Sequence, residues 1–163
     1  MNFINETDVG DVFKDARKNI EYVVITKHQR YIKLAEMQYY NEQVKKGNSG
    51  FLDKEKTIVL QYGNIDDCVY AEYTLDLSLN IFKGKELIVA NTLKEHNTVR
   101  NFEGRKFIVV ENHIDDVLYL VEDTINDAVT NELNGIHLFY QDMEDVVYAK
   151  DVFNIDLKGY TND

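Results

Sequence analysis

The chain has 163 residues, an apolar fraction of 44% and a net charge of −11. This length predicts one domain with a buried core, and Cys68, the only cysteine, excludes an internal disulfide. The sequence has no basic, apolar leader and no apolar run approaching the roughly 20 residues of a membrane span. We therefore expect a soluble, cytoplasmic protein.

The first third of the chain predicts two helices around one strand. Residues 8–18 begin with acidic cap residues and end in Arg17-Lys18, which is typical of a short helix. The β-branched run 21–26 predicts a strand. Residues 29–46 are strong helix formers with a basic end before a glycine, and they predict the first principal helix.

The middle of the chain predicts mostly β-structure. Residues 57–62 predict a strand. Residues 73–82 alternate apolar and polar side chains, and a Lys-Gly-Lys turn follows, so residues 73–91 predict a β-hairpin. The polar residues 92–105 predict a loop.

The last third predicts a second principal helix between two strands. Residues 107–110 and 136–140 are short apolar runs that predict strands. Between them, residues 114–133 place apolar side chains on one face at helical spacing. The predicted order of strand, helix and strand within residues 107–140 also fits a local parallel βαβ unit, which remains an alternative.

These elements predict an α+β fold. We expect a mainly antiparallel sheet of about five to seven strands, with the helices 29–46 and 114–133 packed on one face. A single domain over residues 1–163 is expected, in which residues 1–106 are charge-balanced and residues 107–163 are acidic.

A short pattern occurs three times, at residues 58–71, 107–120 and 136–149. In each copy an apolar run precedes an Ile/Met-acid-Asp string that ends in apolar residues around a tyrosine. The acids fit either the start of a helix or the turn of a hairpin. We interpret the second copy as strand and helix, and the first and third as hairpins. The unequal spacing of the copies favours chance or reuse of a local structure over a solenoid.

The net charge comes entirely from the last third of the chain. Residues 1–106 contain sixteen acids and sixteen bases, whereas residues 107–163 contain thirteen acids and only Lys150 and Lys158. Such an imbalance bears on partners rather than on fold. We predict that the acidic residues of this last third bind a partner: Asp115, Asp116, Glu122, Asp123, Asp127, Asp142, Glu144 and Asp145.

Some of these acids would form a stripe on the predicted helix. Helical rise places Asp123 and Asp127 about 6 Å apart, and Asp116 about 10 Å from Asp123. The shorter spacing is close to that of successive phosphates on a nucleic-acid strand. The alternative is an ordinary solvated helix face.

No catalytic, cofactor or metal-binding motif appears in the sequence. The paired acids are interpreted as turn or helix-cap residues rather than cation ligands. The four histidines are scattered, and Cys68 lies in an apolar string, which is typical of a buried inert thiol. We expect no cofactor and no metal, and an acidic chain is not expected to bind nucleic acid directly.

The hypothesis with most support is a non-enzymatic acidic binding or inhibitor protein, of the kind that phages and mobile elements encode. It would occupy a basic partner, such as a nuclease or a nucleic-acid-binding protein, in the manner of a nucleic-acid mimic. A self-associating structural or assembly protein is the first alternative. An enzyme whose site is assembled from distant residues is the second.

Overall fold

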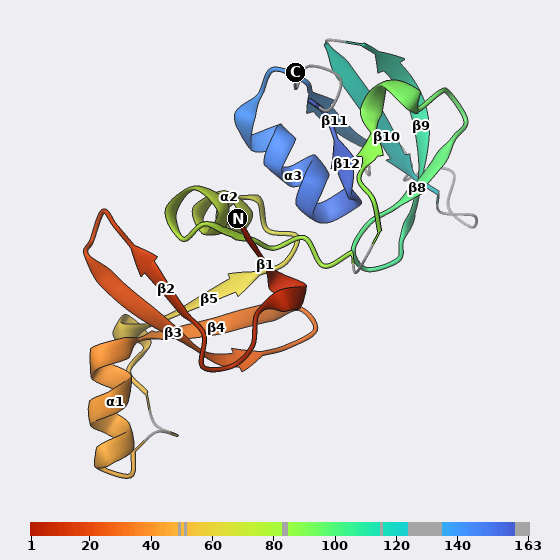
Figure 1. Ribbon diagram of the computed structural model, residues 1–163. Coiled ribbons are helices and arrows are strands. Elements are labelled where there is room, and N and C mark those ends of the chain that lie inside the picture. The colour runs from red at the N-terminus through yellow and green to blue at the C-terminus, as the bar shows by residue number, and fades with distance from the viewer. Residues whose placement is uncertain (49, 51, 83–84, 115, 124–134, 159–163) are drawn as a thin grey trace. The chain divides into compact units, whose positions relative to one another are not determined.

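The computed structural model describes residues 1–48, 50, 52–82, 85–114, 116–123 and 135–158. The chain is α+β and divides into two compact units, Met1–Leu79 and Asn80–Asp163 (Figure 1). Both four-stranded sheets are antiparallel, so the predicted α+β class with mainly antiparallel pairing is confirmed. A single domain with a charge boundary after residue 106 stays a prediction.

The described residues of the first unit form a four-stranded sheet, a pair of short strands and two α-helices. The sheet has the order β2-β3-β4-β5, and β1 pairs in parallel with β6. In chain order, with η for a 3-10 helix, the elements are β1 (Asn2–Phe3), η1 (Ile4–Glu6), β2 (Val12–Asp15), β3 (Ile20–Lys27), β4 (Tyr31–Glu36), α1 (Met37–Lys45), η2 (Lys54–Lys56), β5 (Thr57–Gln61), α2 (Ile65–Thr74) and β6 (Leu77–Ser78).

The described residues of the second unit have a closely similar layout. Their sheet has the order β8-β9-β10-β11, and β7 pairs in parallel with β12. In chain order the elements are β7 (Ile88–Val89), η3 (Ala90–Thr92), β8 (Thr98–Arg100), β9 (Lys106–His113), β10 (Val117–Glu122), β11 (Gly135–Phe139), α3 (Met143–Phe153) and β12 (Ile155–Asp156).

The register of the sheets shows that the two units repeat one fold. Val24 of β3 pairs with Leu34 of β4, and Val109 of β9 pairs with Leu120 of β10. Each of these pairs is followed by an irregularity of one residue in the longer strand, which is a β-bulge in the same place. In the first unit, the segment that connects β4 and β5 contains α1 and η2.

The connection from the last sheet strand to the following helix is also repeated. Asn64 caps α2 by accepting a hydrogen bond from the Asp67 N–H, and Asp142 caps α3 by accepting one from the Asp145 N–H, both at 3.0 Å. In return the Asp67 and Asp145 carboxylates each accept the N–H of the last residue of the preceding strand. Of the two roles predicted for the paired acids, turn or helix cap, Asp67 and Asp145 take the one at the start of a helix.

A left-handed residue follows the end of each helix, Asp76 after α2 and Asn154 after α3, both with φ of 56°. The carbonyl of that residue accepts the N–H that begins β1 or β7, at 3.1 and 2.8 Å. Residues 2–15 therefore correspond to 88–101, and residues 57–79 correspond to 135–157. We conclude that the second unit is a structural repeat of the first.

This repeat corrects the interpretation of the three-copy pattern. The first and third copies are equivalent, because residues 58–71 cover β5 and the start of α2, and residues 136–149 cover β11 and the start of α3. The second copy, residues 107–120, spans the β9-β10 hairpin. The predicted helix of the second copy and the predicted hairpins of the other two are therefore wrong.

Helices pack in both units, as expected in outline, but the bounds of the two principal helices differ. Within 29–46, residues 31–36 form the central strand β4 and only 37–45 are helical. Within 114–133, residues 117–122 form β10, and residues 124–133 lie outside the described residues. The parallel βαβ alternative is wrong, because β10 is antiparallel to both β9 and β11.

The structure confirms some of the smaller predicted elements and contradicts others. The strands at 21–26, 57–62, 107–110 and 136–140 are confirmed as β3, β5, β9 and β11. The predicted helix 8–18 contains β2 instead. The predicted hairpin 73–91 is wrong, because β6 and β7 pair with β1 and β12 rather than with each other.

The core of the second unit lies between its sheet and α3. One face of the sheet contributes Leu118, Leu120 and Leu138, all at most 1% exposed. The ring of Phe107 meets Phe153 of α3 edge to face, with centroids 5.0 Å apart. Side chains alternate along a strand, so the other sheet face points away from this core.

One buried tyrosine position differs between the repeats. Tyr140 donates a hydrogen bond of 2.6 Å to the Asn112 side chain, which itself donates to two backbone carbonyls. At the equivalent position the Tyr62 hydroxyl is buried with no partner among the described residues, and burial raises its pKa to about 12. Lys27, which stands where Asn112 does, donates instead to the carbonyl of Thr7.

This difference predicts unequal effects of the same substitution. Tyr140→Phe is expected to lower the free energy of unfolding by about 1–2 kcal/mol, because the Asn112 side-chain oxygen loses the hydrogen bond from the hydroxyl. Tyr62→Phe removes a hydroxyl with no partner among the described residues, so it should change stability by less than about 0.5 kcal/mol or raise it. Urea unfolding of both variants measures the difference, and equal losses would contradict it.

Candidate partner-binding surface

Four of the predicted acidic site residues meet at one end of the second unit's sheet. The backbone carbonyl of Asp116, in the β9-β10 hairpin, accepts the Tyr140 N–H at 2.9 Å, just after β11. Asp142 follows as the N-cap of α3, and the exposed Glu144 lies with Asp145 in the first turn of that helix. We call Asp116, Asp142, Glu144 and Asp145 the hairpin-end acids.

Two other predicted acids lie at the opposite end of β10 and are paired with bases. Glu122 is 3.7 Å from Arg105, and Asp123 is 3.4 Å from Lys106. A strand rises about 3.3 Å per residue, which puts Asp116 and Asp123 roughly 23 Å apart instead of the 10 Å of a helix. The helical stripe is therefore wrong for the residues of β10, and Asp115 and Asp127 lie outside the described residues.

The structure adds an aromatic row that the sequence analysis missed. On the sheet face away from the core, Tyr119 of β10 stacks on its cross-strand partner His137 of β11, with centroids 4.0 Å apart and planes within 8°. The ring of Phe139 follows on the same strand face, 6.5 Å from His137 and tilted by 20°. We call these three residues the aromatic row.

A glycine fixes the place of the first ring in this row. A Cβ atom at Gly135 of β11 would lie 2.6 Å from the Tyr119 hydroxyl oxygen and 2.7 Å from a ring carbon. The Tyr119 ring therefore covers the backbone of β11 at a point where only glycine leaves room. With His137 on its other side, the ring is held by its neighbours before any partner arrives.

Carboxylates border the aromatic row. Glu111 of β9 is the cross-strand neighbour of Tyr119 and lies 3.2 Å from the His113 side chain. At the far end of the row, Phe139 is followed by Tyr140, whose N–H binds the Asp116 carbonyl, and then by the turn that ends at Asp142. Phe139 is 47% exposed and Met143, in the first turn of α3, is 62% exposed. Exposed apolar groups and acids thus share one continuous region of the second unit.

The first unit does not repeat this surface. By the register of the sheets, Lys33, Val59 and Gln61 of the first unit stand where Tyr119, His137 and Phe139 stand in the second. The charge differs as well, because residues 1–79 contain thirteen acids and ten bases, and residues 80–163 contain sixteen acids and eight bases. The acidic excess and the aromatic row belong to the same repeat.

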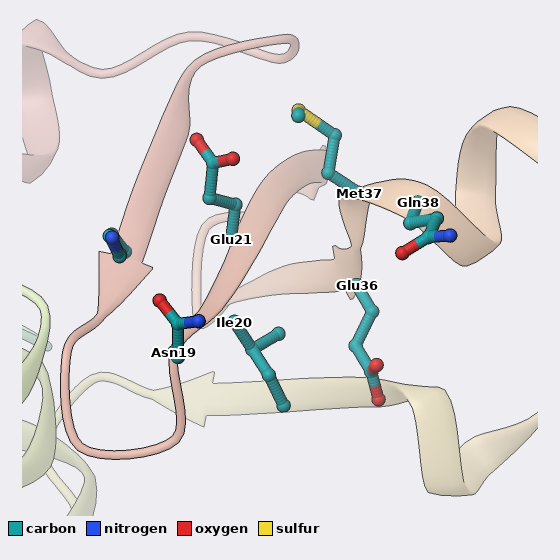
Figure 2. Close-up of a pocket in the computed structure, with 7 residues that line it drawn as sticks. Asn19, Ile20, Glu21, Glu36, Met37 and Gln38 are labelled. Carbon is teal, nitrogen blue, oxygen red and sulfur yellow. The ribbon is translucent and has the colours of Figure 1, made fainter.

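The first unit holds a cavity of about 270 Å³ at the ends of its strands (Figure 2). Its lining residues are Lys14, Asn19, Ile20, Glu21, Glu36, Met37 and Gln38. Figure 2 shows Glu21 and Met37 pointing to one side of the sheet and Ile20 and Glu36 to the other. The two carboxylates therefore do not converge on one ligand position, and Glu36 is 3.9 Å from Lys56.

Among the described residues, no three histidine, cysteine or acidic side chains are grouped as a metal ion would require. No helix in the described ranges is long and apolar enough to cross a membrane. Comparison with known proteins returned no matching family model, no matching curated protein and no matching solved structure.

Proposed function

We propose that this is a non-enzymatic binding protein whose second unit binds a basic protein partner. The surface concerned, which we call the acidic aromatic face, consists of the aromatic row and three hairpin-end acids: Asp116, Tyr119, His137, Phe139, Asp142 and Glu144. The observation that carries the proposal is the position of the exposed aromatic row beside the hairpin-end acids, on the more acidic repeat.

The rings and the acids would act in different ways. Aromatic side chains give large contact areas with little loss of conformational entropy, and they are frequent energetic centres of interfaces. Acids around such a centre accelerate the encounter with a basic surface and disfavour acidic partners. A face that combines both fits a partner with apolar and basic side chains in the same patch.

Nucleic-acid mimicry by a helical stripe is not included in this proposal. The phosphate-like spacing required Asp116 and Asp123 on one helix, and the residues between them form β10. The basic partner would instead contact the outer sheet face and the hairpin end of the second unit.

A matched pair of charge variants tests the proposal. Asp116→Lys, Asp142→Asn and Glu144→Lys together remove charge from the hairpin end while the asparagine retains the α3 cap. Glu6→Lys, Glu21→Lys and Asp66→Asn change the net charge equally on the first unit. Partners are captured from the native cell with each protein, and their affinities are measured over a salt series. The first variant is expected to bind about 10–100-fold more weakly at low salt, and the second to bind like the wild type.

Equal binding by the hairpin-end variant and the wild type at low salt would overturn the proposal. Exposed Phe139 and Met143 also suit the second candidate function, self-association. Sedimentation separates the two. A dimer that depends on concentration and is lost on Phe139→Ser would favour self-association, and a monomer at all concentrations would favour a separate partner.

A further inference from the structure

We infer that the group recognised on the aromatic row is an arginine guanidinium of the partner. This inference rests on the proposed function and names the chemistry of its central contact. It depends on three features of the second unit: the flat stack of Tyr119 and His137, the carboxylates at its border, and the glycine beneath Tyr119.

The first feature is the shape of the stack. The Tyr119 and His137 planes are within 8° of each other, and the ring of Phe139 deviates from His137 by only 20°. Tyr119 and His137 cover each other's facing sides, so a planar, weakly hydrated cation would stack at the Phe139 end of the row, where the Phe139 side chain is 47% exposed. Guanidinium has these properties, whereas the lysine ammonium is compact and strongly hydrated.

The second feature is the placement of the carboxylates. Glu111 borders the row at Tyr119, and Asp116 lies beside Val117, the cross-strand neighbour of Phe139. A guanidinium that stacks on a ring still points its N–H groups outward in its own plane, parallel to the ring, toward carboxylates at the border. Ring and carboxylate contacts with one side chain can therefore form together, and the net negative charge of the unit favours the cation.

The third feature is the rigidity of the site. Gly135 lets the Tyr119 ring lie on the β11 backbone, and His137 holds its other side. Little side-chain entropy remains to be lost when a ligand stacks there. The first unit supports the assignment by contrast, because Lys33 in place of Tyr119 would repel an arginine.

The test uses two capped peptides of equal length, in which arginine or lysine alternates with glycine. Each is titrated into the full-length protein and followed by NMR. The arginine peptide is expected to bind at least about fivefold more tightly, with the largest shifts at Tyr119, His137 and Phe139. Tyr119→Leu with Phe139→Leu should abolish this preference, and so should Gly135→Ala, whose Cβ displaces the Tyr119 ring.

The outcomes separate the two proposals. Equal affinities for both peptides, or shifts away from the row, overturn the arginine assignment. The binding proposal still stands in that case if the hairpin-end charge variant weakens both peptides. If that variant leaves native partner binding unchanged, the binding proposal itself is overturned. If the double leucine variant loses its native spectrum, the single variant Phe139→Leu at an exposed position replaces it.

Discussion

Leu34→Ala and Leu120→Ala are each expected to destabilise the unit that carries them by about 2–5 kcal/mol. The two leucines occupy the equivalent position in β4 and β10, and both are 0% exposed. Truncation removes buried methyl groups and leaves a cavity that a sheet packed on a helix fills only in part. Because each leucine is buried and belongs to one compact unit, amide exchange should rise most within that unit.

Exposed residues of the same sheets provide the controls. Val59→Ala and Val110→Ala truncate side chains that are 44% and 39% exposed, and both should change stability by less than about 0.5 kcal/mol. Hydrogen exchange read by mass spectrometry locates the effect of every variant. An equal loss of protection across both units after either leucine substitution would contradict this expectation.

The sequence predicted the fold class and the longest strands, but it did not reveal the repeat as such. The equivalent copies at 58–71 and 136–149 were found, yet their valine-rich continuations favoured hairpins. What makes them helical is a cap at Asn64 or Asp142 and a carboxylate that returns to the preceding strand. This combination of cap and acid is local, and it is the signal that could have identified both helices.

Local conformational propensity does not predict the two central strands, β4 and β10. Lys33, Leu34 and Ala35 are good helix formers, but they lie between β3 and β5, and pairing with both neighbours decides their conformation. In β10 the residues Val117, Leu118 and Val121 fit a helical period, whereas the buried pair Leu118 and Leu120 fits a two-residue period. The choice between these periods depends on partners far along the chain.

The candidate surface was predicted only incompletely. The acidic excess could be read from the sequence, and four of the acids do meet at the hairpin end. The aromatic row could not be read from it, because Tyr119 and His137 become neighbours only through the register of β10 with β11. The alternation of His137, Leu138 and Phe139 shows which side chains share a face, and no more than that.

Asp15→Asn is expected to lower the free energy of unfolding at pH 7 by about 1.5–3 kcal/mol. The Asp15 carboxylate is 1% exposed and accepts a hydrogen bond of 2.8 Å from the Tyr70 hydroxyl. It also accepts the N–H groups of Arg17 and Lys18, at 3.0 and 3.1 Å. Hydrogen bonds to an ionised acceptor are stronger than those to a neutral one. The neutral amide of asparagine would therefore accept weaker hydrogen bonds at this position.

The same carboxylate predicts how acid affects stability. Burial raises the pKa of Asp15, but the hydrogen bonds from Tyr70 and the two backbone N–H groups outweigh it and hold the pKa below its ordinary value of 3.8. A lowered pKa in the folded state means that the contribution is complete above the pKa of the unfolded carboxyl. It is lost as the pH falls through the folded-state value, so the wild type should weaken below about pH 4.

Urea unfolding between neutral pH and pH 3 gives the free energy of unfolding as a function of pH. Its fall at low pH, the acidic limb of that curve, should be smaller in Asp15→Asn than in the wild type. The variant is expected to fold, because Asn101 occupies the equivalent position in the second unit and its side-chain oxygen accepts two backbone N–H groups in the same manner. Tyr70→Phe removes only one of the three donors and should show a smaller loss at pH 7 with a partly flattened limb. An acidic limb as steep in Asp15→Asn as in the wild type would show that other carboxylates govern the acid sensitivity.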